Sequence, residues 1–134
     1  MFDFAISIAV IHHLSSPSRR VQAIEEILAL LRSPPAGAPK ATNKIGRALI
    51  YVWALEQKTS RRGWDTGDEQ DVMVPWITKE KSHVGQGEEV KTFNRFYHLY
   101  RSGELENDIV KAKGCVVTSG YEKDNWWAIV TNDS

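Results

Sequence analysis

Two adjacent histidines, His12 and His13, directly follow a strongly apolar segment, residues 2–11. The many branched side chains of this segment predict a strand buried on both faces, as in a parallel sheet covered by helices. Ligands of open α/β sheets bind outside the carboxyl ends of the parallel strands. His12 and His13 are therefore candidates for a site at that edge. The alternative is a pair of strand-end histidines bonded to the backbone.

Trp53 stands at the corresponding place near the end of a second apolar segment, residues 47–55. Between the two segments, Ser16 and Pro17 are the types preferred at the N-cap and first position of a helix. Apolar residues then recur at three- and four-residue spacing, which predicts an amphipathic helix over residues 18–31. Its polar positions are filled by Arg19, Arg20, Glu25 and Glu26. Strand, helix and strand in this order predict a right-handed unit with two parallel strands.

Two stretches of the chain are predicted to form loops. Residues 33–46 contain three prolines and two glycines, and residues 56–92 show no sustained hydrophobic period. A structureless stretch as long as the second is uncommon and is usually functional or mobile. After it, residues 93–100 (FNRFYHLY) are predicted to be extended.

The last third of the chain predicts a helix over residues 102–112 and a terminal antiparallel hairpin with strands at 115–121 and 126–131. The predicted fold class is therefore α/β, with two parallel strands, two covering helices and the hairpin. The length of 134 residues suits one domain, so residues 1–134 are assigned to a single domain.

Composition narrows the class of protein further. Cys115 is the only cysteine, which excludes an internal disulfide, and we expect it to be a small buried apolar residue. The four histidines show no metal-ligand spacing, so no metal site is predicted. No apolar run approaches the roughly 20 residues that span a bilayer. The chain is expected to be soluble and intracellular.

The formal net charge is zero, but the charges are unevenly distributed. Residues 32–62 carry seven basic side chains and one acid, whereas residues 63–91 carry seven acids and three bases. Such a basic run is either a solvated loop or a local anchor for an anionic ligand.

Several segments together resemble a known family. They are residues 2–13 (FDFAISIAVIHH), 47–57 (RALIYVWALEQ), 60–63 (SRRG), 69–76 (EQDVMVPW), 95–100 (RFYHLY), 103–105 (GEL) and 124–127 (DNWW). In combination they are similar to class I S-adenosylmethionine-dependent methyltransferases, and more narrowly to the eukaryotic tRNA wobble-uridine (carboxymethyluridine) methyltransferases. The resemblance implies a Rossmann-like methyltransferase sheet.

The resemblance covers only part of the family's pattern. Family members carry an upstream half with a glycine-rich loop that holds the methyl donor, and no G-x-G motif follows a strand here. We therefore expect the carboxyl-terminal half of one methyltransferase domain, without the first three strands and inactive in isolation. A strand with an uncovered edge also predicts marginal stability and self-association.

The reaction that the resemblance implies is methyl esterification of 5-carboxymethyluridine at the tRNA wobble position, with S-adenosylmethionine as donor. The substrate carboxylate is already ionised at pH 7, so the enzyme must mainly position it. Arginine suits a carboxylate, which makes Arg61, Arg62 and Arg95 candidate catalytic residues beside His12 and His13. Arg61 or Arg62 could equally contact tRNA phosphates.

The resemblance implies further site residues. The candidate substrate-binding residues are Trp53, Tyr97, His98, Glu69 and Asp71, and the candidate cofactor-binding residues are Ile11 and His12. Aromatic faces commonly hold unstacked bases, although packing in the core is the alternative for the aromatic residues and solvated acids the alternative for Glu69 and Asp71.

The implied partners are tRNA and a small zinc-binding methyltransferase adaptor protein, which would form a heterodimer, and the implied location is the cytoplasm or also the nucleus. Two other functions stay open. One is a non-catalytic fragment that binds tRNA or protein. The other is a methyltransferase for a small molecule such as a quinol, against which segments 60–63 and 70–76 argue.

Overall fold

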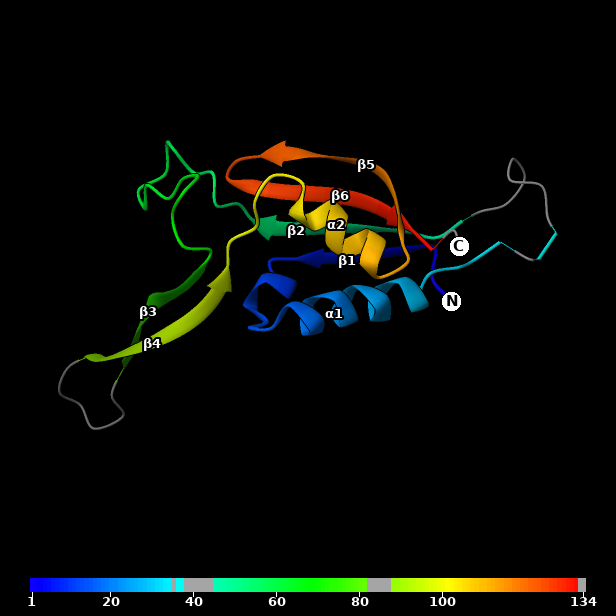
Figure 1. Ribbon diagram of the computed structural model, residues 1–134. Helices are drawn as coiled ribbons and strands as arrows, with labels where there is room; N and C mark the ends of the chain where they lie inside the picture. Colours follow the sequence, from blue (N-terminus) through cyan, green and yellow to red (C-terminus); the bar gives the residue numbers. More distant parts are fainter. Residues whose placement is uncertain (35, 38–44, 82–87, 133–134) are drawn as a thin grey trace.

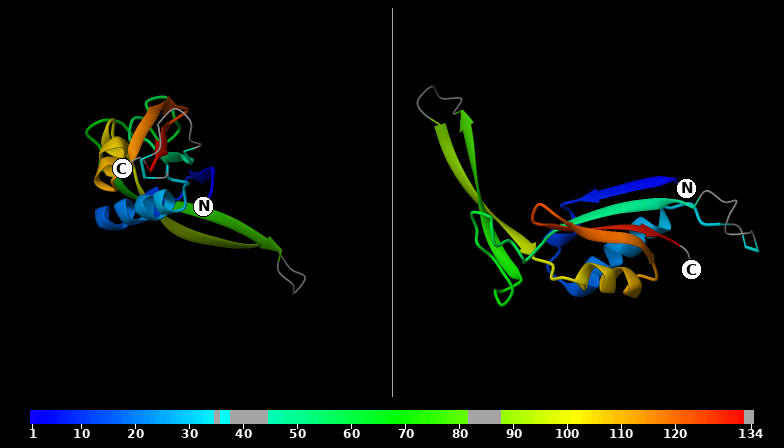
Figure 2. Two further views of the ribbon diagram at one scale, coloured as in Figure 1. Left: turned by 90° about the vertical axis from the view of Figure 1, so that its right-hand side faces the viewer. Right: turned by 90° about the horizontal axis from the view of Figure 1, so that it is seen from above.

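The computed structural model describes residues 1–34, 36–37, 45–81 and 88–132. Figure 1 shows a body, in which four strands form one sheet, and an arm of two long strands that projects from one end of it. Both helices lie on the same face of the sheet, as the view from above in Figure 2 shows. In chain order the elements are β1 (Phe4–Ile8), the 3-10 helix η1 (Ile11–His13), α1 (Pro17–Ala29), β2 (Arg47–Trp53), β3 (Asp71–Lys81), β4 (Glu88–His98), α2 (Glu104–Lys111), β5 (Cys115–Glu122) and β6 (Asn125–Thr131).

The predicted strand–helix–strand unit is confirmed. β1 pairs in parallel with β2, with Ile6 opposite Leu49. The Ser16 hydroxyl caps α1 by accepting the Arg19 backbone N–H, and Pro17 is the first helical residue. The α/β fold class is confirmed as well, because the strands and helices follow the predicted order.

The terminal hairpin is also confirmed, and it completes the sheet in the order β1-β2-β6-β5. Alternate residues of β2 and β6 point towards the helices and bury against them. The core there consists of Ile11, Ile24, Leu28, Leu31, Ala48, Ile50, Val52, Tyr100, Leu105, Ile109, Ala112, Ala128 and Val130.

The prediction that β1 is buried on both faces is wrong. Phe4, Ile6 and Ile8 are 79%, 70% and 56% exposed, while the alternate residues Ala5 and Ser7 face the helices. β1 is an edge strand, and no described element covers the side of the sheet opposite the helices. The apolar pattern of the segment is typical of a strand that is covered on both faces. The described residues cover only the face that carries Ala5 and Ser7.

The prediction of a loop over residues 56–92 is wrong for much of its length. β3 pairs with β4 in an antiparallel arm from Asp71 opposite His98 to Lys81 opposite Glu88. The sequence carries no clear strand signal for the arm, because Pro75 interrupts its first strand. The two strands form by pairing with each other, and hydrophobic periodicity within one segment does not indicate such pairing. The predicted loop over residues 33–46 lies partly outside the described residues.

Two smaller predictions are corrected. Arg20 is buried rather than a polar surface position of α1, and its guanidinium donates a 2.7 Å hydrogen bond to the Leu14 carbonyl. Cys115 is exposed rather than buried, because it lies on the outer strand β5. None of the described helices is long and apolar enough to cross a membrane.

Candidate functional site

The carboxyl ends of β1 and β2 meet at one edge of the sheet, where the arm also joins the body (Figure 1). After β1 the chain passes through Ala9, a non-glycine residue in the left-handed region (φ 58°), whose N–H donates to the Tyr51 carbonyl. Non-glycine residues at positive φ are uncommon and concentrate at functional sites. The turn brings Ile11–His13 beside the end of β2.

His12 is completely buried at this edge. Its Nδ1 accepts the Trp53 backbone N–H at 3.0 Å, so the proton of the neutral ring is on Nε2. Nε2 has no hydrogen-bond partner among the described residues. Burial, together with the neighbouring His13 and His98, lowers the pKa of His12 to about 3. His12 is therefore neutral at physiological pH and offers a donor N–H rather than a basic nitrogen.

His13 connects the edge to the arm. Its Nδ1 lies 3.0 Å from the Phe96 carbonyl oxygen of β4, and since a carbonyl only accepts, Nδ1 carries a proton. The His13 ring also packs at 4.4 Å between centroids against Tyr97. The structure thus brings the two predicted histidines together with the predicted base-binding residues.

An aromatic stack lies beside the histidines. Trp53, the last residue of β2, stacks on Tyr97 of β4 with ring centroids 4.1 Å apart and planes 10° from parallel. On the other side, the Arg62 guanidinium lies 4.7 Å from the Trp53 centroid and 5.5 Å from that of Trp64. Tyr97 is almost fully buried and Trp53 is half-buried, so the stack holds the arm to the body, and the exposed Arg62 covers the face of Trp53 that Tyr97 leaves free.

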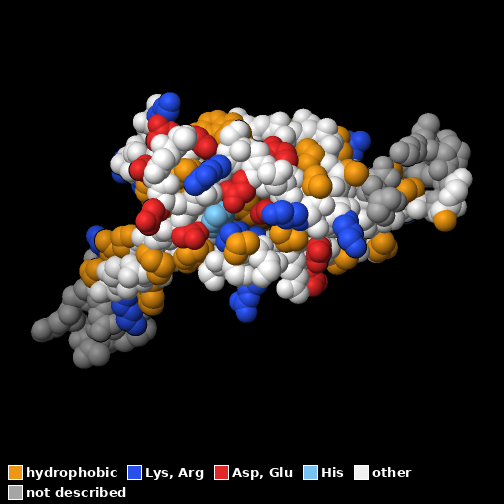
Figure 3. Space-filling model, in the orientation of Figure 1, with side chains coloured by type: hydrophobic (Ala, Val, Ile, Leu, Met, Phe, Trp, Pro, Cys, Tyr) orange, Lys and Arg blue, Asp and Glu red, His pale blue; other side chains and the backbone are white. Residues whose placement is uncertain are grey.

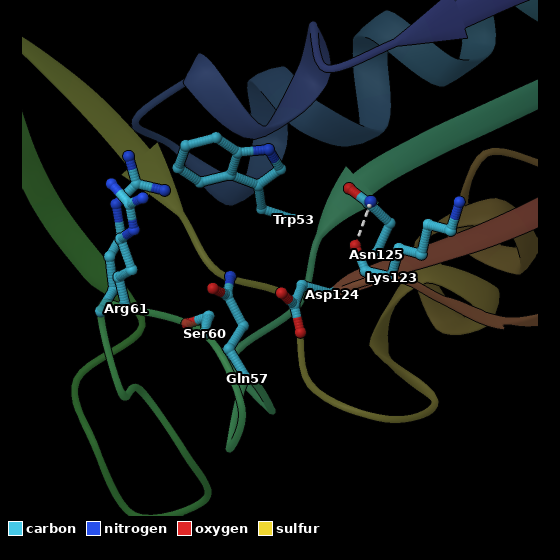
Figure 4. Close-up of a pocket in the computed structure, with 8 residues that line it drawn as sticks. Trp53, Gln57, Ser60, Arg61, Lys123, Asp124 and Asn125 are labelled. Atoms are coloured by element: carbon cyan, nitrogen blue, oxygen red, sulfur yellow. Dashed lines mark hydrogen bonds between the residues drawn. The ribbon is translucent and has the colours of Figure 1, made fainter.

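An open cavity of about 380 Å³ lies in front of this stack. Figure 4 shows its wall: Trp53 from the end of β2, the following turn, and the β5–β6 turn. The lining residues are Trp53, Gln57, Ser60, Arg61, Arg62, Lys123, Asp124 and Asn125. Three of these side chains are cationic and one is acidic, which favours an anionic ligand.

Arg95, the third predicted arginine, borders a separate and more open hollow with His13 and Phe96. Its guanidinium lies 4.3 Å from the centroid of the Trp76 ring on the arm. All three predicted arginines are therefore near the carboxyl ends of the strands, but Arg95 lies on the arm side and Arg61 and Arg62 on the cavity side.

His98 and Asp71, predicted to bind substrate, line neither hollow. The His98 nitrogens lie 2.7 Å from Asp71 Oδ1 and 2.7 Å from Glu104 Oε2, which joins the base of the arm to the start of α2. Burial alone would lower the pKa of His98, but the hydrogen bonds to Glu104 and Asp71 outweigh it and raise that pKa. Burial would likewise raise the pKa of Glu104, and its bonds to His98 and the Arg101 backbone lower it instead.

The remaining predicted residues also lie away from the cavity. Glu69 is exposed in the segment before β3, and the Ile11 side chain is buried in the core. Of the described residues, no three His, Cys, Asp or Glu side chains are grouped as metal ligands would be.

Some lining residues were not predicted from the sequence. Gln57 is buried and donates to the Ala54 carbonyl, and the turn at Lys123, Asp124 and Asn125 reaches the cavity because Asn125 pairs with Trp53. An antiparallel strand next to β2 places its preceding turn at the carboxyl end of β2. The predicted hairpin could have indicated this turn only if its neighbour in the sheet had been known.

Two solved structures share the fold of this chain. A structure of an S-adenosylmethionine-dependent methyltransferase from Clostridium acetobutylicum aligns with a TM-score of 0.71 at 9% identity, covering 99% of this chain and 59% of that one. The glycopeptide N-methyltransferase MtfA aligns with a TM-score of 0.55 at 12% identity, covering 96% of this chain and 53% of that one. The chain thus has part of a Rossmann-like methyltransferase fold, as predicted.

The relatives found by sequence are more specific than the shared fold, because they are named tRNA methyltransferases. The tRNA (carboxymethyluridine(34)-5-O)-methyltransferase of Schizosaccharomyces pombe is 45% identical over 96% of this chain, and the Saccharomyces cerevisiae protein of the same name is 36% identical over 96%. The predicted resemblance to these enzymes is confirmed. The chain spans 56% and 61% of the length of the two relatives. No family model matches the chain.

Proposed function

We propose that this chain is the substrate-side part of a tRNA methyltransferase that converts 5-carboxymethyluridine at the wobble position to its methyl ester. The observation that carries the proposal is the cavity in which Arg61 and Arg62 lie beside Trp53 at the carboxyl edge of the sheet. A flat aromatic ring suits a base, and guanidinium groups suit its carboxylate. The names of the fungal relatives identify the same reaction.

In this proposal the chain's residues act by positioning. The carboxylate is ionised at neutral pH, so no general base is needed, and a neutral His12 agrees with that requirement. Arg61 and Arg62 would fix the carboxylate, while the stack of Arg62, Trp53 and Tyr97 forms a rigid wall against which the base would lie. Arg95 would approach the RNA from the arm side.

S-adenosylmethionine would supply the methyl group. The residues predicted to contact it fit that role poorly, because the Ile11 and His12 side chains are 1% and 0% exposed. We therefore assign the main contacts to the donor to residues outside this chain, in keeping with its 56–61% coverage of the relatives.

The proposed partners are tRNA and a small zinc-binding adaptor protein. The exposed apolar side chains of the edge strand β1 favour a protein partner or a further part of the same protein against that strand. The proposed location is the cytoplasm or also the nucleus, where such RNA is available.

A non-catalytic RNA-binding role is the second candidate, and the poor fit of Ile11 and His12 to a methyl donor favours it for the chain alone. The deciding experiment incubates the protein at its natural full length, with the adaptor, with S-adenosylmethionine and three substrates. These are an anticodon stem-loop RNA with carboxymethyluridine, the same RNA with the carboxamide, and a quinol.

The expected product is a methyl ester on the carboxymethyluridine RNA alone, detected by mass spectrometry of the digested nucleosides. RNA binding without transfer would favour the non-catalytic role. Transfer to the quinol alone would overturn the assignment of an RNA substrate.

A further inference from the structure

The β3–β4 arm carries an exposed aromatic surface that the proposed carboxylate site does not use. Successive residues of a strand point to opposite faces, and paired residues of two strands share a face. Trp76 pairs with Phe93, and Val74 with Arg95, so these four residues share one face of the arm. Met73 and Ile77 belong to the opposite face.

This aromatic face, defined by Trp76, Phe93 and Arg95, is accessible. Trp76 is 38% and Phe93 54% exposed, and the Arg95 guanidinium lies over the Trp76 ring. The Trp76 Nε1–H donates to the Tyr97 hydroxyl at 3.2 Å, which fixes the indole and leaves it as a rigid plane. Figure 3 shows hydrophobic side chains gathered over the part of the arm next to the body.

The aromatic face begins at the candidate site. Arg95 borders the hollow that contains His13, and Tyr97 stacks on Trp53. From that junction the face runs outward along the arm, which extends away from the body in both views of Figure 2. A polymer with one unit bound at Trp53 would meet the aromatic face with its neighbouring units.

The charges of the arm favour an anionic polymer. In the described stretches 72–79 and 90–97, the charged residues are Lys79, Lys91 and Arg95, all of them basic. By strand pairing, Lys91 and Arg95 belong to the aromatic face and Lys79 to the opposite one. Asp71 stands at the base of the arm, and nearer the tip the sequence adds one lysine and three glutamates, so the proposed surface is confined to the stretch between them. Aromatic planes beside cations are the usual means of holding unpaired nucleotides.

We infer that the aromatic face of the arm binds the unpaired nucleotides next to the modified uridine of the anticodon loop, by stacking on Trp76 and Phe93. The inference rests on the proposed function and names the element that holds the rest of the loop. Arg95 would pair its charge with the phosphates while it stacks on Trp76.

The test uses leucine variants, because leucine keeps apolar bulk but has no aromatic plane. In the full-length protein with its adaptor, Trp76→Leu and Phe93→Leu are compared with Met73→Leu and Ile77→Leu, which change exposed residues of the opposite face. The readouts are the Kd for a carboxymethyluridine stem-loop RNA and for the same RNA with an abasic site beside the modified uridine.

We expect each aromatic variant to weaken binding of the stem-loop by about tenfold, as loss of one stacked base does, and to raise KM rather than lower kcat. Trp76→Phe should restore most of the affinity. The abasic RNA should bind wild type more weakly, and with this RNA one of the two aromatic variants should bind as wild type does, because the base that its side chain would stack on is missing. Met73→Leu and Ile77→Leu should leave all values unchanged.

If the aromatic variants bind the stem-loop as wild type does, the inference is wrong while the proposed function stands. If the aromatic and control variants all lose the adaptor in size-exclusion chromatography, the arm is a protein-docking surface and the inference is wrong as well. If wild type itself neither binds nor methylates the RNA, the proposed function has failed, which is a separate result.

Discussion

Arg62 combines two interactions that lysine cannot reproduce. Its planar guanidinium stacks on Trp53 and Trp64, and it lines the cavity where a carboxylate is expected. Lysine keeps the charge but lacks the plane and the paired donors. The role proposed for Arg62 therefore depends on the shape of the guanidinium group as well as on its charge.

We predict that Arg62→Lys raises KM for the carboxymethyluridine RNA by about tenfold, equivalent to roughly 1.4 kcal/mol. Steady-state kinetics of the full-length protein measure this change in KM. The matched control is Arg47→Lys, the same change at the exposed start of β2, at the opposite end of that strand. Equal KM values for the two variants would contradict the role given to Arg62.

His12 should remain neutral at pH values well below the ordinary pKa of a histidine. Burial lowers that pKa to about 3, so nitrogen-resolved NMR from pH 8 to pH 5 should show one neutral form protonated on Nε2. As the pH falls below about 6.5, the unfolded chain takes up the proton first, so the folded state loses stability through this residue. A titration midpoint near 6.5 would show that His12 is not buried as described.

The base of the arm is held by one cluster of polar groups. His98 of β4 lies between Asp71 of β3 and Glu104 of α2, and Gln70 donates to Glu104 at 2.6 Å. The nearby Arg20 opposes the charge on His98, although the carboxylates outweigh it. The cluster therefore joins the arm to the body through both strands of the arm and α2.

The cluster should make stability depend on pH. The raised pKa of His98 gives stability that is complete below about 6.5 and lost as the pH rises through the folded-state value. The lowered pKa of Glu104 gives stability that is complete above its ordinary value of 4.5 and lost as the pH falls through the folded-state value. The two effects coexist between about pH 5 and pH 6.5.

We predict that His98→Gln lowers the free energy of unfolding by about 2 kcal/mol at pH 6 and by less at pH 9. Urea denaturation at both pH values measures the difference. Glu106→Gln, on the same helix but outside the cluster, serves as the control and should show little pH-dependent difference from wild type. A loss for His98→Gln that is equal at both pH values would contradict a charged His98.

At the scale of the whole molecule, the helices cover one face of the sheet and leave apolar residues of β1 on the other. We predict that the 134-residue chain self-associates through this edge strand, and that Ile6→Lys reduces the association, because lysine protects exposed strand edges. Sedimentation velocity measures the species present. Val110→Lys, a charge introduced at an exposed apolar position of α2, should leave the association unchanged.

A monomeric wild type would contradict this prediction, as would equal behaviour of the two lysine variants.

The sequence predicted the elements whose signals are local. The cap at Ser16, the helical spacing in α1 and the terminal hairpin each depend on neighbouring residues, and all three are confirmed. It did not predict what depends on distant partners: the β3–β4 pairing, or the bonding of His98 to Asp71, 27 residues away. The exposure of β1 is of the same kind, because covering a strand requires another element.

The candidate site also has one part that local sequence signals predict and one part that depends on distant partners. The edge of the sheet was predicted because strand direction alone places His12, His13 and Trp53 there. The cavity itself needs the β5–β6 turn to meet the turn at Arg61, which no local pattern indicates.

The central claim is that the wobble nucleotide binds at this edge, between the cavity of Arg61 and Arg62 and the base of the arm. Photo-cross-linking tests it most directly, with a stem-loop RNA that carries 4-thiouridine at the wobble position and the full-length protein with its adaptor. Peptide mass spectrometry then locates the cross-links. The account predicts cross-links within residues 53–64 or 93–97, and cross-links confined to α1 or to the outer strand β5 would contradict it.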